Sequence, residues 1–371
     1  MSTDKEIEQS IIEELEDIQN VDDTVEPEDE SSSGNLYSIS SYGVDHNVEG
    51  LVKRISNEQY YIPPFQRKYV WSQNDASRFI ESLLLGLPVP GLFLYKEQES
   101  PKHLVIDGQQ RLKSLQKFYT GTFGEKKFRL TGLKSRWNDL SYEELTEDDK
   151  LRLDDAIIHA TIFKQDTPTD SMDSVYEVFE RINTGGMKLS PQEIRTCVAH
   201  GQFNSLLFEL NEDINWRSVF GVKSMRLKDV EMVLRFLSFY ENRENYQRPM
   251  KAFLTNFMSK NKNISSERSD IFKDIWVNLN KLTVVSLGPK PFRPGGRALN
   301  AAFWDCFMVA AAKEMKQHSE SDFIKLLKSA YDLLVKNEEF LKSISSSTAD
   351  DENIKTRFRI ASEAFNNGNS S

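Results

Sequence analysis

Apolar residues recur at two different spacings along this chain, and the change from one spacing to the other divides the chain into two parts. Short apolar runs at 92–95 and 104–106, separated by the turn-forming sequence QESP, predict a β-hairpin. A third run at 157–163 indicates another strand. Beyond about residue 170 the apolar residues recur every three or four positions, as they do on one face of a helix. We therefore expect a mixed α/β part followed by a helical part.

Polar residues mark where several helices begin. Ser72 with Asp75, and Ser190 with Glu193, are helix-start signals, because the serine hydroxyl and the acid three residues later cap each other's backbone groups. Pro191 strengthens the second start, since proline is favoured at the first helical position. Further helical faces are predicted at 48–55, 109–119, 175–182, 230–237, 302–310, 323–331 and 354–365.

These elements predict an α+β fold with four parts. Residues 1–36 form an acidic tail, and residues 37–165 a small mixed α/β domain. Residues 166–345 form a mostly helical domain, and residues 346–371 a C-terminal helix with a polar tail. Ile7, Ile11, Leu15 and Ile18 recur at helical spacing within the acidic tail, so both a disordered tail and a short helix fit that segment.

Charge is distributed unevenly along the chain. The net charge is −10, but residues 1–34 alone hold thirteen acidic residues and one lysine, which gives −12 and leaves +2 for the rest. A nearly neutral body neither requires nor excludes nucleic acid as a partner. No apolar run approaches the length that spans a membrane, and the N-terminus lacks the regions of a signal peptide. We expect a soluble, cytoplasmic protein that does not bind membranes.

The sequence LVIDGQQRL combines a strand ending with a helix beginning. Its apolar residues run into Asp107 and Gly108, and the helical spacing then starts at Gln109. The unpaired N–H groups and the dipole of a helix N-terminus favour anions, and Gly108 lets a ligand approach the backbone. Arg111 in the first turn is expected to grip a phosphate, and Asp107 to hold Mg²⁺ or water. A purely structural turn explains the same residues equally well.

Two other polar clusters support a shared site. IPPFQRKYVW places Gln66 and Arg67 after a rigid Pro-Pro pair, and INTGGMKLSPQEIR places Asn183, Gly185 and Gly186 before a capped helix. Each cluster taken singly also fits a structural turn or a glycine helix end.

Several common catalytic motifs are missing from the sequence. It contains no GxxxxGK[ST], no GxGxxG after a strand and no GxSxG. Cys197 and Cys306 form no CxxC pair, and the five histidines show no metal-ligand spacing. A P-loop enzyme, a dinucleotide-binding fold and a zinc site are therefore not expected.

Four motifs in order resemble one known family. IPPFQRKYVW, LVIDGQQRL, VFERINTGGMKLSPQEIR and RLKDVEMVLRF look like the N-terminal domain of the GmrSD restriction endonucleases, over roughly residues 37–345. Members of this family are ParB- and sulfiredoxin-like. The resemblance implies an NTP site, with ATP, GTP or CTP and Mg²⁺ as cofactors. Asp107, Gln110 and Arg111 would be catalytic, with Asp107 also binding the metal.

The same resemblance assigns further residues and partners. Gln66, Arg67, Gly108, Gln109, Asn183, Gly185 and Gly186 would bind the nucleotide. The implied function is an NTP-binding and NTP-hydrolysing sensor or regulator subunit in a modification-dependent, restriction-like phage defence system. DNA and a separate nuclease subunit are the implied macromolecular partners. The oligomeric state stays open.

One departure from the family limits this expectation. Many members carry an HNH nuclease half, whereas His318 is the only histidine beyond residue 200 and fits no HNH motif. We therefore expect a stand-alone protein without HNH nuclease activity. Two alternatives stay open, namely a non-enzymatic DNA- or protein-binding module and a ParB-like metal-dependent nuclease.

Overall fold

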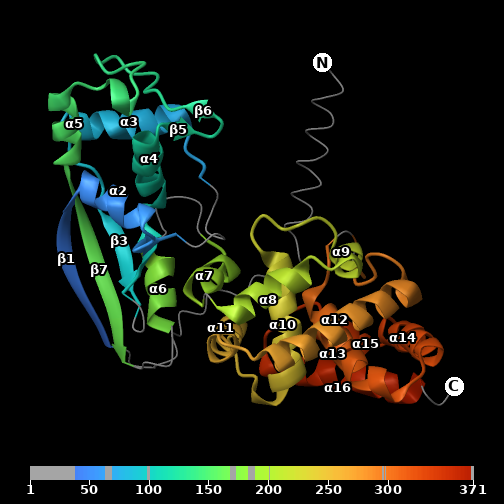
Figure 1. Cartoon of the computed structure of the whole chain (residues 1–371). Coiled ribbons are helices and arrows are strands. Elements are labelled where there is room, and N and C mark those ends of the chain that lie inside the picture. Colours follow the sequence, from blue (N-terminus) through green and yellow to red (C-terminus); the bar gives the residue numbers. More distant parts are fainter. Residues whose placement is uncertain are drawn as a thin grey trace, which may run out of the picture. The chain divides into compact units, whose positions relative to one another are not determined.

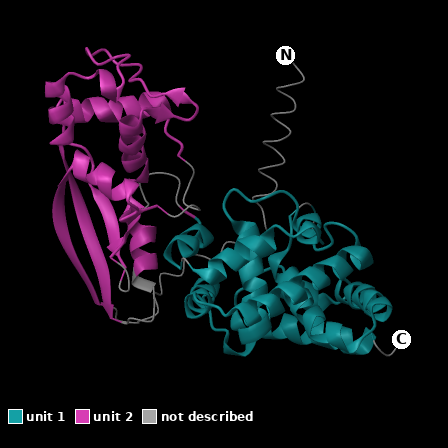
Figure 2. Ribbon diagram, in the orientation of Figure 1, with its two compact units in different colours: residues 1–35, 190–371 teal, residues 36–189 magenta. Residues whose placement is uncertain are grey.

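The computed structural model describes residues 38–62, 69–97, 101–167, 173–182, 189–199, 201–294, 296 and 298–368. These residues fall into two compact units that meet in sequence between Leu189 and Ser190 (Figure 2). Each unit has a hydrophobic core of its own, with one core built from residues 48–162 and the other from residues 199–365.

The unit of residues 36–189, magenta in Figure 2, contains a mixed five-stranded sheet (Figure 1). Its strand order is β1-β7-β3-β4-β2. The strands are β1 (Ser38–Asn47), β2 (Tyr60–Tyr61), β3 (Leu92–Lys96), β4 (His103–Asp107) and β7 (Ile157–Thr167). The predicted hairpin is present, because β3 and β4 pair antiparallel. Both β2 with β4 and β3 with β7 pair in parallel.

The apolar pattern did not predict strand β1. Its sequence, SISSYGVDHN, has few apolar residues, and most of its side chains are exposed or only partly buried. It pairs antiparallel with β7 along its whole length, at the edge of the sheet. Its conformation therefore comes from backbone hydrogen bonds to a buried neighbour, which leave little trace in the hydrophobic pattern.

Helices pack with the sheet to complete this unit. They are α2 (Val48–Ser56), α3 (Gln73–Leu84), α4 (Gln109–Thr120), α5 (Glu147–Asp154) and α6 (Asp173–Ile182), with a small hairpin of β5 (Thr122–Phe123) and β6 (Lys126–Lys127). The predicted start of α3 is confirmed, since Ser72 and Asp75 form a reciprocal capping box. Leu112, Leu115 and Phe118 of α4 are fully buried in the shared core, which fixes this helix firmly.

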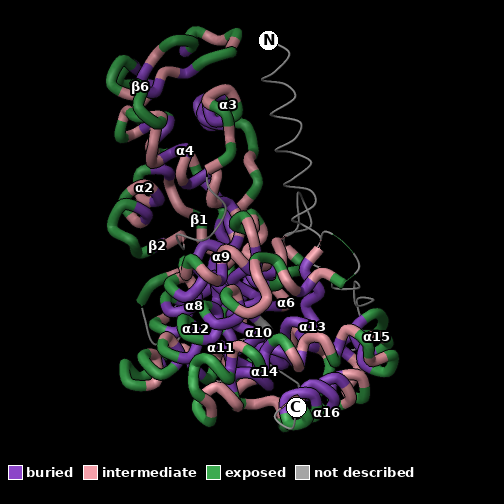
Figure 3. Tube along the Cα trace, turned by 90° about the vertical axis from the view of Figure 1, so that its right-hand side faces the viewer, coloured by how far each residue is buried: buried purple, intermediate pink, exposed green. Residues whose placement is uncertain are grey.

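The other unit, teal in Figure 2, is helical in residues 190–371 as far as the structure describes them. Its helices are α7 (Pro191–Val198), α8 (Gln202–Asn211), α9 (Ile214–Phe220), α10 (Lys228–Asn242), α11 (Met250–Lys260), α12 (Ser266–Leu287), α13 (Ala301–Glu314), α14 (Glu320–Leu334), α15 (Glu338–Ser343) and α16 (Asp351–Gly368). The capping box predicted at Ser190 and Glu193 is confirmed. Helices α10 and α13 are buried on almost every side (Figure 3).

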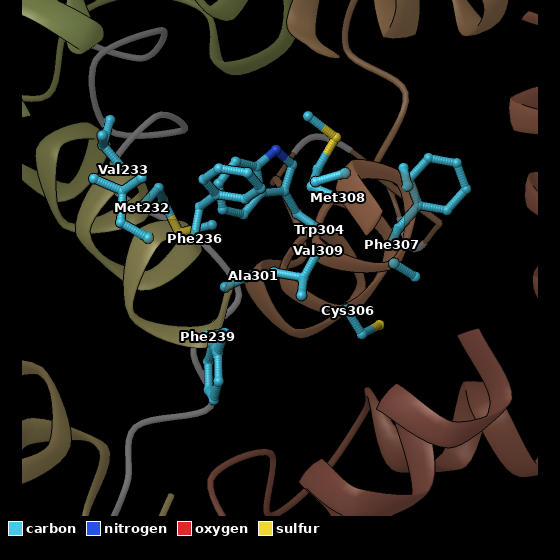
Figure 4. Close-up of a cluster of buried hydrophobic side chains, with 14 of the residues drawn as sticks. Met232, Val233, Phe236, Phe239, Ala301, Trp304, Cys306, Phe307, Met308 and Val309 are labelled. Carbon is cyan, nitrogen blue, oxygen red and sulfur yellow. The ribbon is translucent and has the colours of Figure 1, made fainter. Parts of the chain in front are cut away.

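Aromatic and aliphatic side chains fill the space between α10 and α13 (Figure 4). Phe236 and Trp304 meet edge to face within this cluster. Two buried arginines inside the helical unit are paired with acids. Arg235 of α10 donates to the fully buried Asp305 of α13, and Arg195 of α7 donates to Glu231 at 3.0 Å. Pairing is the condition under which charges are tolerated in such an interior.

The predicted fold class is confirmed, because a mixed sheet near the N-terminus is followed by a mostly helical region. The compact units divide between residues 189 and 190, whereas the sequence predicted a boundary at 165. Helix α6 explains the difference, since it packs against β4 and β7 and so belongs with the sheet. Within the parts of the chain that the structure describes, no helix is long and apolar enough to cross a membrane.

Candidate functional site

The predicted joint between strand and helix lies where β4 passes into α4. Because β2 and β4 are parallel neighbours, their carboxyl ends point to the same edge of the sheet. The chain enters the DGQQR sequence from the end of β4, and it enters the PPFQR sequence from the end of β2. In parallel sheets this edge is where ligands commonly bind. In the folded chain, two of the three polar clusters therefore begin at the same edge of the sheet.

Gly108 makes the tight turn between β4 and α4. Its φ of +98° lies in the left-handed region, where residues other than glycine are strained. A Cβ at this position would lie 2.3 Å from Cδ2 of Leu92, so the side chain of Leu92 would have to move to admit any other residue. As the N-cap of α4, Gly108 has no side chain with which to bond the first-turn N–H groups.

Arg111 and Asp107 form an ion pair across this turn. The Nη2 atom of Arg111 donates to Oδ2 of Asp107 at 2.6 Å, with the two residues four positions apart. The Nη1 atom donates to the carbonyl oxygens of Pro90 and Gly91, the latter at 2.9 Å. Arg111 is only 8% exposed. Its guanidinium thus joins the end of β4 to the chain that enters β3.

These contacts differ from the phosphate contact that we expected of Arg111. An arginine in the first turn opposes the helix dipole and needs an anion nearby. The Asp107 carboxylate is that anion. It lies just before the helix N-terminus, where the helix dipole also stabilises its negative charge. The side chain of Asp107 remains 45% exposed, and no donor from the described residues contacts its Oδ1 atom. Arg111 therefore holds one carboxylate oxygen and leaves the other without a described donor.

Gln110 connects α4 to the chain that follows the FQR sequence. Its Oε1 atom accepts from the backbone N–H groups of Val70 at 3.0 Å and Trp71 at 3.3 Å. One turn further along α4, the Ser114 hydroxyl lies 2.8 Å from the Tyr69 hydroxyl. The segment 69–71 is thereby fixed along α4. Gln110 acts here as a structural link between two of the clusters, a role that the sequence did not predict.

Gln109 presents an unsatisfied group in the first turn of α4. Its side-chain Oε1 atom is buried and has no hydrogen-bond partner within the described part of the chain. A buried polar atom without a partner costs about 1–3 kcal/mol. Such an atom next to a helix N-terminus is a position where a ligand donor would be favourable.

Five of the predicted site residues lie outside the described residues, namely Gln66, Arg67, Asn183, Gly185 and Gly186. Their nucleotide-binding roles stay predictions. Their described flanks are informative, because Tyr69 and Val70 contact α4, and Ile182 ends a helix that packs against β4.

The residues that are described provide a limited set of metal ligands. No group of three or more histidine, cysteine or acidic side chains gathers among them in a way that could hold a metal ion. A magnesium ion that arrives with a nucleotide needs fewer protein ligands, since phosphate oxygens and water supply the rest. The Oδ1 atom of Asp107, which no described donor contacts, fits that kind of site and does not make a dedicated metal centre.

Sequence reasoning missed the backbone groups of this site. The carbonyl oxygens of Pro90 and Gly91 bind Arg111, and the amides of Val70 and Trp71 bind Gln110. Backbone groups have no residue-type signature, so the only signal was indirect. The Pro-Gly pair just before a predicted strand indicated a turn, but it did not indicate which side chain would bond there.

Comparison with known proteins gives a family for this part of the chain. Residues 48–199 match the family described as "GmrSD restriction endonuclease, N-terminal domain". An uncharacterized protein of Methanocaldococcus jannaschii is 32% identical over 93 residues, which is 19% of this chain and only 16% of that protein's length. The family match includes the whole β4–α4 joint and the flanks of the other two clusters. Residues 48–199 of this chain are therefore similar to the N-terminal domain of the GmrSD restriction endonucleases, over less than half of the chain.

Proposed function

We propose that the β4–α4 joint binds a nucleoside triphosphate and hydrolyses it, as the regulatory step of a restriction-like defence system. The similarity of residues 48–199 to a restriction endonuclease domain family indicates the defence role. One observation carries the finer proposal: Arg111 holds the Asp107 carboxylate at the end of β4, beside a helix N-terminus that has no side-chain cap.

The first turn of α4 is the proposed phosphate-binding element. Its backbone N–H groups and the positive end of the helix dipole attract negatively charged oxygens. Gly108 leaves this end of the helix without a competing side-chain cap. The unsatisfied side-chain oxygen of Gln109 accepts hydrogen bonds only, so it would bond a hydroxyl or amino group of the nucleotide, or a water molecule, and not a phosphate oxygen. The uncapped helix N-terminus suits the terminal phosphates of a nucleotide better than it suits an uncharged ligand.

Asp107 is the proposed reactive side chain. Its Oδ1 atom faces no donor of the described chain and is available to orient a water molecule toward a phosphorus atom. A magnesium ion, when bound with the nucleotide, supplies positive charge that offsets the charge of the phosphates. Arg111 acts on this reaction through Asp107, because its donors bond the carboxylate and two carbonyl groups. In this proposal Arg111 is a positioning residue.

Hydrolysis would change the state of the protein as it acts with DNA and a separate nuclease subunit. Gln110 offers a physical route for such a change, since it bonds the chain that follows Gln66 and Arg67 to the helix that begins at the proposed site. Loss of the terminal phosphate would alter the contacts at the N-terminus of α4. A cytoplasmic location is part of this proposal.

Phosphate release tests the proposal directly. Release from ATP, GTP, CTP and UTP with Mg²⁺ would be measured with and without phage DNA. The wild type would be compared with Asp107→Asn and with Asp148→Asn, an exposed acid on α5. We expect turnover of at least one nucleotide, a fall of about 100-fold in Asp107→Asn, and no change in Asp148→Asn. Thermal melting of each variant separates loss of activity from loss of fold.

Other outcomes would favour the alternative functions. Absence of turnover with every nucleotide would overturn hydrolysis, and salt-dependent DNA binding without turnover would then favour a binding module. Metal-dependent nicking of DNA that disappears in Asp107→Ala would favour a nuclease. Equal turnover by Asp107→Asn and the wild type would remove the assigned role of Asp107.

A further inference from the structure

Lys113 lies on α4 one helical turn after Gln109, and it is partly buried. It forms no ion pair with any residue that the structure describes, whereas most other partly buried cations among the described residues have acidic partners close by. An unpaired ammonium group that has lost part of its hydration is energetically unfavourable. Its presence next to the proposed phosphate site therefore needs an explanation.

Lys117, a second cation on the same helix, makes the charged form of Lys113 still less favourable. Lys117 lies four residues after Lys113, so the two ammonium groups repel each other along the same side of the helix. Lys117 cannot easily turn away, because its amine lies 4.8 Å from the ring centre of Tyr69 and 5.3 Å from that of Phe123. Burial, followed by repulsion from Lys117, lowers the pKa of Lys113. The free protein thus keeps a destabilised cation at this position.

A cation that binds the phosphates must face them, and Arg111 does not do so. It is nearly buried, and its two Nη atoms are engaged with Asp107, Pro90 and Gly91. Helical side chains lean toward the N-terminus, so Lys113 extends back over the turn that begins at Gln109. The helix rise places these two residues about 6 Å apart along the axis, which an extended lysine side chain spans.

We propose that Lys113 is the cationic group that contacts the phosphates of the bound nucleotide, with Arg111 confined to positioning Asp107. This inference rests on the proposed function, since it names a ligand-binding residue of the same site. An anion bound over the first turn of α4 would offset both the lost hydration of Lys113 and its repulsion by Lys117. The unsatisfied Gln109 oxygen lies one turn before Lys113, and as an acceptor it would bond a hydroxyl or amino group of the nucleotide, while the phosphates take their contact from Lys113.

Binding of inorganic tripolyphosphate and of each of the four nucleotides tests this assignment. Calorimetric titrations would compare the wild type with Lys113→Met, which keeps the length of the side chain and removes its charge. Lys134→Met, at an exposed loop position without a described ion pair, is the matched control. We expect Lys113→Met to weaken binding of tripolyphosphate by at least about 10-fold, and Lys134→Met to leave it unchanged.

Thermal melting of the same variants excludes a merely structural role. Without ligand, Lys113→Met should melt at or above the wild-type temperature, because the change removes an unfavourable cation. The added stability that tripolyphosphate gives the wild type should be lost in the variant. Equal binding by the variant and the wild type would overturn the role of Lys113 alone. Absence of binding of every probe by the wild type would overturn the nucleotide site itself.

Discussion

At the scale of single residues, Arg111 is the side chain on which the geometry of the joint depends. Arg111→Met removes three hydrogen bonds to Asp107 and to the carbonyl groups of Pro90 and Gly91. We expect the free energy of unfolding to fall by about 2–3 kcal/mol, which allows for the partial exposure of Asp107. Urea denaturation followed by circular dichroism measures this change.

Arg181→Met is a suitable control for that measurement. Arg181 lies exposed at the end of α6, and its Nη2 atom is 3.8 Å from Glu177, so its loss should cost less than about 0.5 kcal/mol. A similar small loss in Arg111→Met would show that its buried bonds contribute little to the fold.

Two histidines make the stability of the α/β unit depend on pH. Burial lowers the pKa of both His46 and His103, and the Tyr60 hydroxyl lies 2.7 Å from Nε2 of His46. Because the unfolded chain then binds more protons than the folded chain, stability is complete above the ordinary histidine pKa of about 6.5. Stability falls as the pH decreases from there through the lowered folded pKa values.

The double variant His46→Gln/His103→Gln should therefore lose less stability than the wild type between about pH 8 and pH 5. Melting temperatures across this range measure the difference, and the acidic residues that titrate in both proteins cancel. Parallel profiles for the two proteins would contradict the assignment of this pH dependence to the histidines.

At the scale of elements, Gln110 decides how the segment 69–71 is fixed to α4. Gln110→Ala leaves the N–H groups of Val70 and Trp71 without their acceptor. We expect faster amide hydrogen exchange at these two residues and a stability loss of about 1–2 kcal/mol. Gln116→Ala, on the same helix but without a described side-chain hydrogen bond, should change neither quantity. Unchanged exchange in Gln110→Ala would mean that other contacts hold the segment.

At the scale of the whole molecule, each compact unit has a core of its own, so the helical unit should fold without the sheet. A fragment spanning residues 190–371 should give a cooperative melting transition. Cys197 and Cys306 are both fully buried in the whole chain, Cys306 lies within the core of this unit, and burial raises the pKa of Cys306 to about 12. Both thiols should resist labelling at pH 8 until the fragment unfolds. Rapid labelling of both in the fragment alone would contradict independent folding.

The sequence allowed prediction of the elements that bury an apolar face. The strands β3, β4 and β7, the helices α4 and α10, and the capped starts of α3 and α7 all appeared where spacing and capping residues indicated. Strand β1 was missed, because an edge strand takes its conformation from its neighbour. The position of α6 beside the sheet was also missed, since helical spacing does not state which unit a helix packs against.

The sequence by itself determined that a strand ends at Asp107, that a turn requiring glycine follows, and that a helix begins at Gln109. Local backbone preference and apolar spacing are sufficient for these conclusions. Only the tertiary structure decided that Arg111 binds Asp107 and two carbonyl groups, and that the chain following β2 lies along α4. Such contacts join residues that are distant in sequence, and backbone partners leave no signature in residue type. The same structure left Lys113 of α4 without a described ion pair, one helical turn from Gln109.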